Sequence, residues 1–183
     1  LLSRGLGDVY KRQLHASLLR YCAPEQLPEA SYRCSHCQKS ARATKQLRLF
    51  QLPPVLCIQL KRYEHGLSAT KVDTRVHFPF VLDVHECCAH TAHEDESLDP
   101  YAYAYDLFTV VVHEGTLTSG HYTNYSKWRG LWYRYDDDKV TRVSTHQVLE
   151  ARAYQLFYLR RRLWNQPGPV SYTHLRAHET RGN

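Results

Sequence analysis

Methionine is absent from the 183 residues, so we expect that the chain does not begin at its own start codon. Long apolar runs are absent too. The longest run of aliphatic and cysteine side chains is Val55–Ile58, far below the roughly 20 residues that a membrane-spanning helix needs. We therefore expect no membrane partner. No secretory signal is recognisable, and six cysteines without an evident disulfide framework indicate a reducing, intracellular compartment.

A strong excess of one charge is also lacking. The formal net charge is +6, and half of that excess lies in the two ends of the chain, residues 1–13 and 170–183. The body between them is therefore only mildly basic. A nucleic-acid-binding domain usually carries a much larger basic surplus gathered on one face. We expect no direct nucleic acid binding.

The two ends are related through their coding DNA. Ser3–Gln13 can be encoded by a DNA segment whose reverse complement, read in a shifted frame, encodes Val170–Glu179. A chance match of this length is implausible, and the DNA resembles a transposon-based sequencing adaptor. We therefore expect residues 1–13 and 170–183 to be translated adaptor sequence, which leaves 14–169 as one partial domain. Amphipathic terminal arms are the alternative.

Strand patterns dominate the body of the chain. Val55–Tyr63 is apolar on both faces, which predicts a central strand with Cys57 buried inside it. A buried thiol behaves as a small apolar side chain, so we expect Cys57 to be a poor nucleophile. Tyr103–His113 and Tyr154–Leu159 show the same strong strand character.

Helical patterns are few and short. Leu14–Tyr21 has the apolar spacing of an amphipathic helix that ends before Pro24. Thr145–Ala151 is typical of a second short helix, for which Thr145 is a suitable N-cap.

A predicted hairpin near the middle of the second half holds the main candidate site. Two aromatic-rich strand segments, His121–Lys127 and Leu131–Tyr135, are joined by a short turn that contains Gly130. If the hairpin folds between residues 128 and 129, His121 lies opposite Asp136. Directly opposed residues have Cβ atoms about 4.5–5.5 Å apart, close enough for a carboxylate to accept a hydrogen bond from an imidazole.

A histidine that is oriented by an aspartate supplies two members of a nucleophilic triad. This interpretation makes His121 a general base and Asp136 its orienting residue. The geometry fits equally well a polar cross-strand pair at the rim of a sheet, without chemistry. Both interpretations remain open at this point.

Two cysteines with zinc-ligand spacing stand in the first third of the chain. Cys34 and Cys37 form a Cys-x-x-Cys pair, which is half of a four-cysteine zinc site. A redox pair would need a thioredoxin-like setting, which is missing. No second Cys-x-x-Cys follows, so we expect a structural zinc half-site whose other ligands lie upstream. Lone surface cysteines are the alternative.

Several short motifs occur in one fixed order along the chain. They are Tyr-x-Cys-x-x-Cys at 32–37, Lys-Gln-Leu at 45–47, Leu-Pro-Pro-Val-Leu at 52–56, Gln-Leu-Lys-Arg-Tyr-Glu at 59–64, Gly-His-Tyr at 120–122, Tyr-Asp-Asp at 135–137 and Tyr-x-Leu-Phe-Tyr at 154–158. Together they resemble the ubiquitin-specific protease family of cysteine deubiquitinases, most closely the type found in the SAGA coactivator. The resemblance covers nearly all of residues 14–162.

The resemblance implies an α+β fold of the papain-like cysteine-peptidase superfamily, built as fingers, palm and thumb. This chain would hold the lower fingers and the palm, which are mostly antiparallel sheet. In this family the position of His121 is the general base, and that of Asp136 orients it. Asp137 matches a neighbouring acidic position that some members use.

Further residues and partners follow from the same resemblance. Gly120 and Tyr122 are expected to bind substrate beside the channel for the ubiquitin tail, and a glycine lets the backbone approach a slender tail. Cys34 and Cys37 match a zinc pair of the fingers. Ubiquitin and ubiquitinated proteins are the implied partners, with a multiprotein transcriptional coactivator complex as a further one. The implied location is nuclear or cytoplasmic, with the nucleus favoured.

The cysteine motif that supplies the family's nucleophile is missing from this sequence, as is the first zinc pair. The expected function is therefore that of the C-terminal part of a thiol-dependent protease that hydrolyses the isopeptide bond at the ubiquitin C-terminus. This fragment alone should be inactive. A non-catalytic, zinc-stabilised ubiquitin-binding or scaffold module is the alternative.

Overall fold

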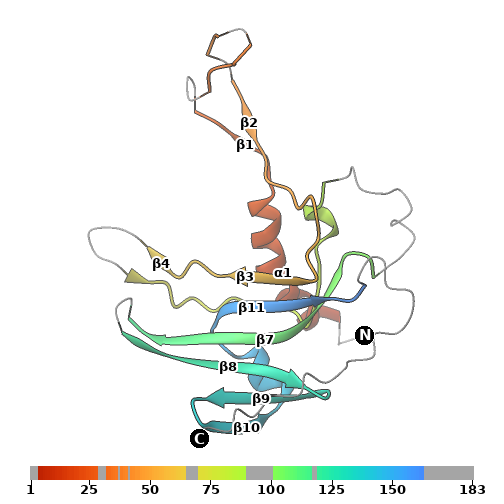
Figure 1. The fold of residues 1–183 in the computed structure, drawn as a ribbon, viewed down its shortest axis with the longest axis vertical. Coiled ribbons are helices and arrows are strands. Elements are labelled where there is room, and N and C mark those ends of the chain that lie inside the picture. The colour runs from red at the N-terminus through yellow and green to blue at the C-terminus, as the bar shows by residue number, and fades with distance from the viewer. Residues whose placement is uncertain are drawn as a thin grey trace, which may run out of the picture.

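The main body is an antiparallel sheet from which a narrow two-stranded arm projects (Figure 1). The computed structural model describes residues 4–28, 32–36, 38–40, 42–64, 70–89, 101–116 and 119–162. None of the helices in these ranges is long and apolar enough to cross a bilayer.

Within these ranges the large sheet has seven strands, in the order β10-β9-β8-β7-β11-β3, and β6 also pairs with β7. Every pairing in this sheet is antiparallel. The strands are β3 (Val55–Gln59), β6 (Val81–Asp83), β7 (Ala104–Gly115), β8 (Gly120–Trp128), β9 (Leu131–Asp136), β10 (Lys139–Val143) and β11 (Ala153–Arg160). The predicted α+β fold with a mostly antiparallel sheet is confirmed.

Helices and short strands complete the described chain. They are α1 (Arg4–Tyr21), β1 (Glu25–Gln26), β2 (Thr44–Lys45), β4 (Tyr63–Glu64), β5 (Thr70–Lys71), the 3-10 helix η1 (His85–Cys87) and α2 (Thr145–Leu149). Pairs β1–β2 and β4–β5 are separate two-stranded sheets. The first of these pairs forms the projecting arm in Figure 1.

Helix α1 begins well before the predicted start at Leu14 and so runs across the predicted adaptor boundary. The side chain of Gln13 accepts a hydrogen bond from the backbone N–H of His77 at 3.1 Å, and Leu14 is buried. The C-terminal range 170–183 lies outside the described residues. The adaptor origin of both ends stays a prediction.

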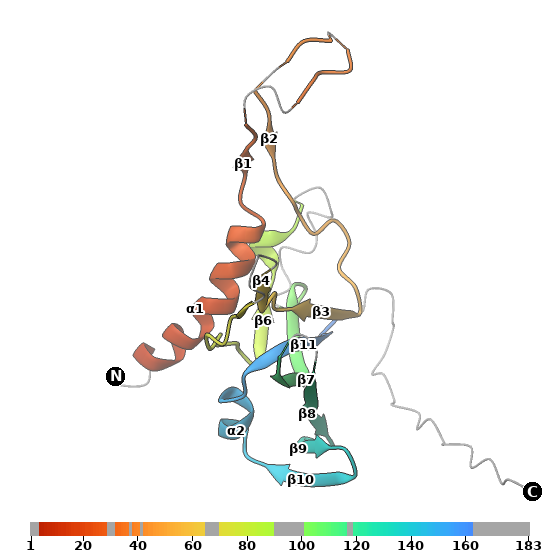
Figure 2. The same ribbon diagram turned by 90° about the vertical axis from the view of Figure 1, so that its left-hand side faces the viewer.

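The core lies between the large sheet and the α-helices α1 and α2, which lie on the same side of it in Figure 2. Leu14 of α1 and Val148 of α2 are fully buried against Leu107, Val110 and Leu156 of the central strands β7 and β11. Each fully buried aliphatic side chain stabilises the fold by about 1.5–3 kcal/mol. These central strands therefore form a firm support for the neighbouring β8, which carries His121.

Two local predictions are wrong. Among the described strands β3 pairs only with β11, so it is an edge strand there, and Cys57 is exposed instead of buried. An apolar run alone does not show whether a strand lies in the centre or at the edge of a sheet.

The N-cap of α2 is Ser144, not Thr145. Its Oγ accepts from the N–H of Gln147 at 3.2 Å, and the Gln147 side chain accepts from the N–H of Ser144 at 2.8 Å, which is a capping box.

The turn between β8 and β9 also differs from the prediction. Trp128 pairs with Leu131, so the two-residue turn consists of Arg129 and Gly130, with φ angles of 48° and 80°. Two positive φ angles are the mark of a type I′ hairpin. The hairpin therefore folds between Arg129 and Gly130, one residue later than predicted, which shifts the strand register by two residues.

This turn gives a stability prediction. Gly130→Ala should lower the free energy of unfolding by about 1 kcal/mol, because a left-handed backbone costs roughly that much for a residue with a Cβ. A Cβ at Gly130 would contact nothing within 4 Å, so the loss would report the backbone alone. Arg129→Asn should raise the free energy of unfolding, because asparagine tolerates positive φ. Urea denaturation measures both, and a neutral Gly130→Ala would contradict this turn.

Candidate active site

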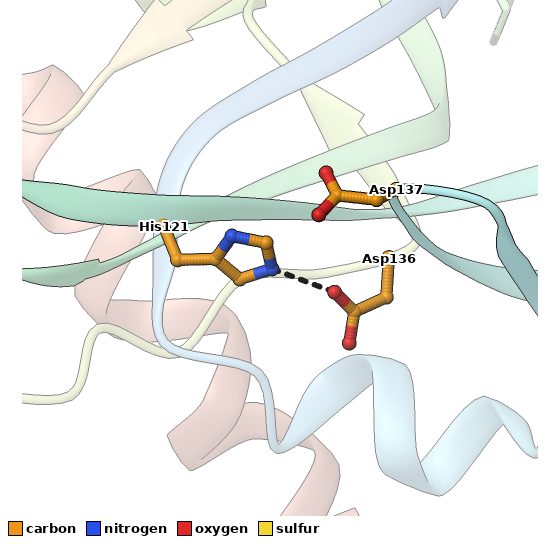
Figure 3. A group of neighbouring side chains, drawn as sticks. All are labelled: His121, Asp136 and Asp137. Atoms are coloured by element: carbon orange, nitrogen blue, oxygen red, sulfur yellow. Dashed lines mark hydrogen bonds and ion pairs between the residues drawn. The ribbon is translucent and has the colours of Figure 1, made fainter.

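Three neighbouring segments at one edge region of the large sheet bring the candidate site together. His121 is the second residue of β8, Asp136 is the last residue of β9, and Asp137 follows in the turn to β10 with a φ of 50°. Figure 3 shows the two carboxylates beside the imidazole ring, with a dashed line only to Asp136. The potential ligand atoms of the three residues all lie within 4.8 Å of one another.

His121 and Asp136 form a short hydrogen bond. The distance between His121 Nε2 and Asp136 Oδ1 is 2.6 Å. The observed β8–β9 register, continued by one pair, would place Thr123 opposite Asp136. His121 is two residues from Thr123, so it lies on the same face as a diagonal neighbour of Asp136. The predicted contact is therefore present, although the predicted register is wrong by two residues.

The carboxylate of Asp136 is held from two sides. Its second oxygen accepts from Nη1 of Arg134 at 3.1 Å. The hydrogen bond from His121 lowers the pKa of Asp136, and the charge of Arg134 lowers it further, despite partial desolvation. Arg134 did not enter the sequence prediction, although a residue two positions before Asp136 on a strand shares its face. Together with His121, Arg134 keeps Asp136 ionised and oriented.

His121 is correspondingly basic. The hydrogen bond to Asp136 raises the pKa of His121, and the nearby charges of Asp137, Asp136 and Glu114 raise it further, against a smaller opposing effect of desolvation. Because Nε2 is engaged by Asp136, Nδ1 is the nitrogen that can exchange a proton with a reacting group. The side chain is 47% exposed, so that group can approach from outside this chain.

The pKa shift gives a test in the chain itself. We expect His121 to titrate above the ordinary value of about 6.5. The raised pKa of His121 then stabilises the fold fully at pH values below its ordinary pKa, and this stabilisation is lost as the pH rises through the folded-state pKa. The lowered pKa of Asp136 has the opposite pH dependence. It stabilises the fold at pH values above the ordinary pKa of an aspartate, and this stabilisation is lost as the pH falls through the folded-state pKa.

NMR titration of the His121 ring protons measures this shift. Asp136→Asn should lower the pKa of His121 more than Asp137→Asn does, because the hydrogen bond is the largest cause of the rise. A His121 pKa at or below that of an isolated imidazole would contradict the described pair.

The two predicted substrate-binding residues flank His121. Tyr122 is 57% exposed, and its ring centroid lies 4.6 Å from that of His113. A Cβ added to Gly120 would lie 2.1 Å from Nε2 of His113 and 2.7 Å from the carbonyl oxygen of Glu114. Internal packing is thus one reason for glycine here. The substrate roles of Gly120 and Tyr122 stay predictions.

The described cysteines do not provide a partner for His121. Cys57 is on β3, three strands away from β8 in the sheet order, which corresponds to about 14 Å. Cys22, Cys87 and Cys88 are buried near α1 and η1. Burial, and to a lesser extent contact with Cys22, raises the pKa of the Cys87 thiol to about 12. A reactive thiol needs the opposite, an exposed and electropositive setting.

Cys34, the described member of the predicted zinc pair, lies between β1 and β2 of the arm, whereas His121 lies on β8 of the large sheet. Cys34 is half-buried in a turn whose flanks pair through Arg33 and Ser40, and its carbonyl accepts from the N–H of Gln38 at 2.9 Å. Cys37 lies outside the described residues. In the described ranges, the single group of three possible metal ligands is the one at His121, not one that includes Cys34. Zinc binding therefore stays a proposal.

Comparison with known proteins defines the family. A family model described as ubiquitin carboxyl-terminal hydrolase matches residues 26–158. Ubiquitin carboxyl-terminal hydrolase 8 of Saccharomyces cerevisiae is 35% identical over 153 residues, which cover 81% of this chain and 32% of that protein. Human ubiquitin carboxyl-terminal hydrolase 22 is 36% identical over 172 residues, covering 83% and 33%. The chain belongs to the ubiquitin carboxyl-terminal hydrolase family.

Similar solved structures narrow the family assignment to the ubiquitin-specific proteases. A SAGA Ubp8/Sgf11/Sus1/Sgf73 DUB module bound to ubiquitin aldehyde gives a TM-score of 0.71 at 34% identity, over 82% of this chain and 34% of that chain. A yeast SAGA DUB module with an Sgf73 variant gives 0.70 at 35% identity, over 82% and 33%. The fold is that of their papain-like catalytic domains. The chain spans about a third of the length of the relatives it matches.

Proposed function

We propose that this chain is the C-terminal part of a thiol-dependent ubiquitin-specific protease that hydrolyses the isopeptide bond at the ubiquitin C-terminus. The observation that carries the proposal is the 2.6 Å hydrogen bond between His121 and Asp136 in a domain of this family. The nucleophilic cysteine would stand in a segment upstream of this chain. The chain alone would then be inactive.

The residues suit the chemistry of acyl transfer to a thiol. His121 would take the thiol proton at Nδ1, and the thiolate would attack the carbonyl carbon of the terminal ubiquitin glycine. The protonated His121 then returns its proton to the leaving lysine amine. Water, with His121 again as the base, hydrolyses the thioester and frees the cysteine. Asp136 fixes the tautomer of His121 and stabilises its protonated form.

Hydrolysis of a ubiquitin C-terminal fluorogenic amide tests the proposal. This chain alone should neither cleave the amide nor form an adduct with a ubiquitin-derived electrophile. A protein that carries the chain together with its upstream segment should do both, with the adduct on an upstream cysteine in an Asn-(x)₅-Cys arrangement that opens a helix. An adduct on Cys57 or another cysteine of this chain would overturn the assignment.

One observation favours a second function. In the described residues no thiol is placed to react with His121, which also suits a non-catalytic, zinc-stabilised ubiquitin-binding or scaffold module. Serine or alanine at the upstream cysteine position would support this alternative. In that case ubiquitin should still bind, while the amide substrate should remain intact.

Zinc binding gives a further prediction. Cys34 and Cys37 supply half of a tetrahedral site, so this chain should bind zinc weakly and below one ion per chain. Restoring the upstream ligands should give one tightly held zinc at this site. Metal analysis after chelator treatment measures the difference, with Cys34→Ala as the test variant and the exposed Cys57→Ala as its control. Tight stoichiometric zinc in the chain alone would contradict the half-site.

The similar structures suggest the partners. Their modules combine Ubp8 with Sgf11, Sus1 and Sgf73, and one is bound to ubiquitin aldehyde. By similarity, the whole protein would bind ubiquitin and ubiquitinated proteins and join a multiprotein transcriptional coactivator complex. An intracellular and nuclear location fits such a complex.

A further inference from the structure

We propose that His113 is a positioning residue for the site: its buried ring packs against Gly120 and fixes the backbone that carries His121. The inference rests on the proposed function, because it assigns His113 a role in placing that general base. His113 itself would contact neither the substrate nor the nucleophile.

The contact between His113 and Gly120 is very close. His113 lies on β7 and is only 9% exposed. Its Nε2 occupies the space into which a side chain at position 120 would project, since a Cβ there would lie 2.1 Å from that atom. His121 is the next residue along the chain. Any movement of the His113 ring toward β8 therefore displaces the backbone immediately before the catalytic histidine.

The ring of His113 is fixed by its neighbours. The hydroxyl of Tyr63 lies 2.6 Å from Nδ1, and the rings of Tyr122 and Tyr154 have centroids 4.6 Å and 5.8 Å from that of His113. The backbone is held as well, because Nζ of Lys71 donates to the carbonyl oxygen of His113 at 2.9 Å and to that of Gly115 at 3.2 Å. Side chains of β4 and β5 thus hold the end of β7 in place through hydrogen bonds.

These contacts exclude His113 as a second base. One ring nitrogen is engaged by Tyr63 and the other is covered by Gly120. A group that needs to exchange protons with substrate must have a free nitrogen that the substrate can reach. The remaining role is mechanical: a rigid side chain sets where β8 begins and so where His121 meets Asp136. Displacement of a catalytic group by about 1 Å can cost about 10²-fold in rate.

NMR of this chain tests the positioning directly, without any activity. His113→Ala should lower the pKa of His121 toward that of an isolated imidazole, because the hydrogen bond to Asp136 weakens when the backbone shifts. His113→Phe, which keeps a ring against Gly120, should preserve most of the raised pKa. Val110→Ala is the control, a core change on the same strand that should destabilise the fold and leave the His121 pKa unchanged. Equal effects of His113→Ala and Val110→Ala would overturn the proposal.

A double-mutant comparison tests the contact itself. Gly120→Ala should reduce the denaturation midpoint more in the original chain than in a His113→Ala background, because the smaller side chain removes the overlap with the His113 ring and leaves only the one with the backbone carbonyl oxygen of Glu114. Additive losses would mean that the two residues do not share that space, which would also overturn the proposal.

The longer protein distinguishes this inference from the proposed function. His113→Ala should lower kcat by about 10²-fold with little change in KM, and His113→Phe should recover most of the loss. A longer protein that is inactive before any substitution would refute the proposed function, while the NMR result would still decide the role of His113. Full activity of folded His113→Ala would overturn the positioning role.

Discussion

Replacing His121 with alanine should lower kcat/KM for a ubiquitin C-terminal amide by at least about 10²–10⁴-fold in a protein that carries this chain with its upstream cysteine. Nε2 of His121 is hydrogen-bonded to the carboxylate of Asp136, which leaves Nδ1 to take the thiol proton. Without it the thiol keeps its proton, so both the supply of thiolate and the protonation of the leaving amine are lost. Steady-state kinetics at saturating and limiting substrate measures the effect.

A matched histidine controls for general effects of the substitution. His146 on α2 is also exposed and lies 3.9 Å from a carboxylate oxygen of Glu150, yet it is not in the candidate site. His146→Ala should leave the rate unchanged. Ubiquitin binding should survive His121→Ala, because we expect recognition to spread over the palm and fingers. Equal rates for the His121 and His146 variants would remove His121 from the mechanism.

Asp136→Asn should have the second largest effect, a loss of about 10–10³-fold in kcat. Asparagine can still accept a hydrogen bond at this position, but it loses the charge that stabilises the protonated imidazole. The same change in a serine protease triad costs about 10⁴-fold, and a thiol should lose less because it ionises more readily. The loss should be smaller than that of His121→Ala. Kinetics measured across the pH range would also show that the pKa of His121 shifts downward.

Asp137 provides the matched control for Asp136. It carries the same charge near His121 but makes no described hydrogen bond to the ring. Asp137→Asn should therefore cost least of the three substitutions. If it proves more damaging than Asp136→Asn, the orienting carboxylate is Asp137, and the arrangement in Figure 3 is not the working one.

The pairing of His121 with Asp136 could be predicted from sequence although the register could not. Side chains on a strand alternate between faces, so a register error of two residues keeps both on the same face. The error came from the turn, because Arg129 is an unusual residue for positive φ and gave no sign of a two-residue turn. An error of one residue would have separated the pair completely.

Other features depend on long-range packing that local patterns do not carry. Nothing in the apolar pattern of β3 indicates that β11 is its single partner among the strands that the structure describes. The contact of His113 with Gly120 is a diagonal one across β7 and β8, and its prediction would need the register of those strands. That register depends on the length and shape of the intervening turn, which residues 116–119 alone do not specify.

The most direct test of the central claim is the pH dependence of alkylation of the upstream cysteine in the longer protein. If His121 and Asp136 activate this thiol, it should react as a thiolate with a pKa well below the ordinary value of about 8.5. In the His121→Ala variant the reaction should follow an ordinary thiol pKa, and in Asp136→Asn an intermediate one. An unchanged alkylation profile in His121→Ala would contradict the account.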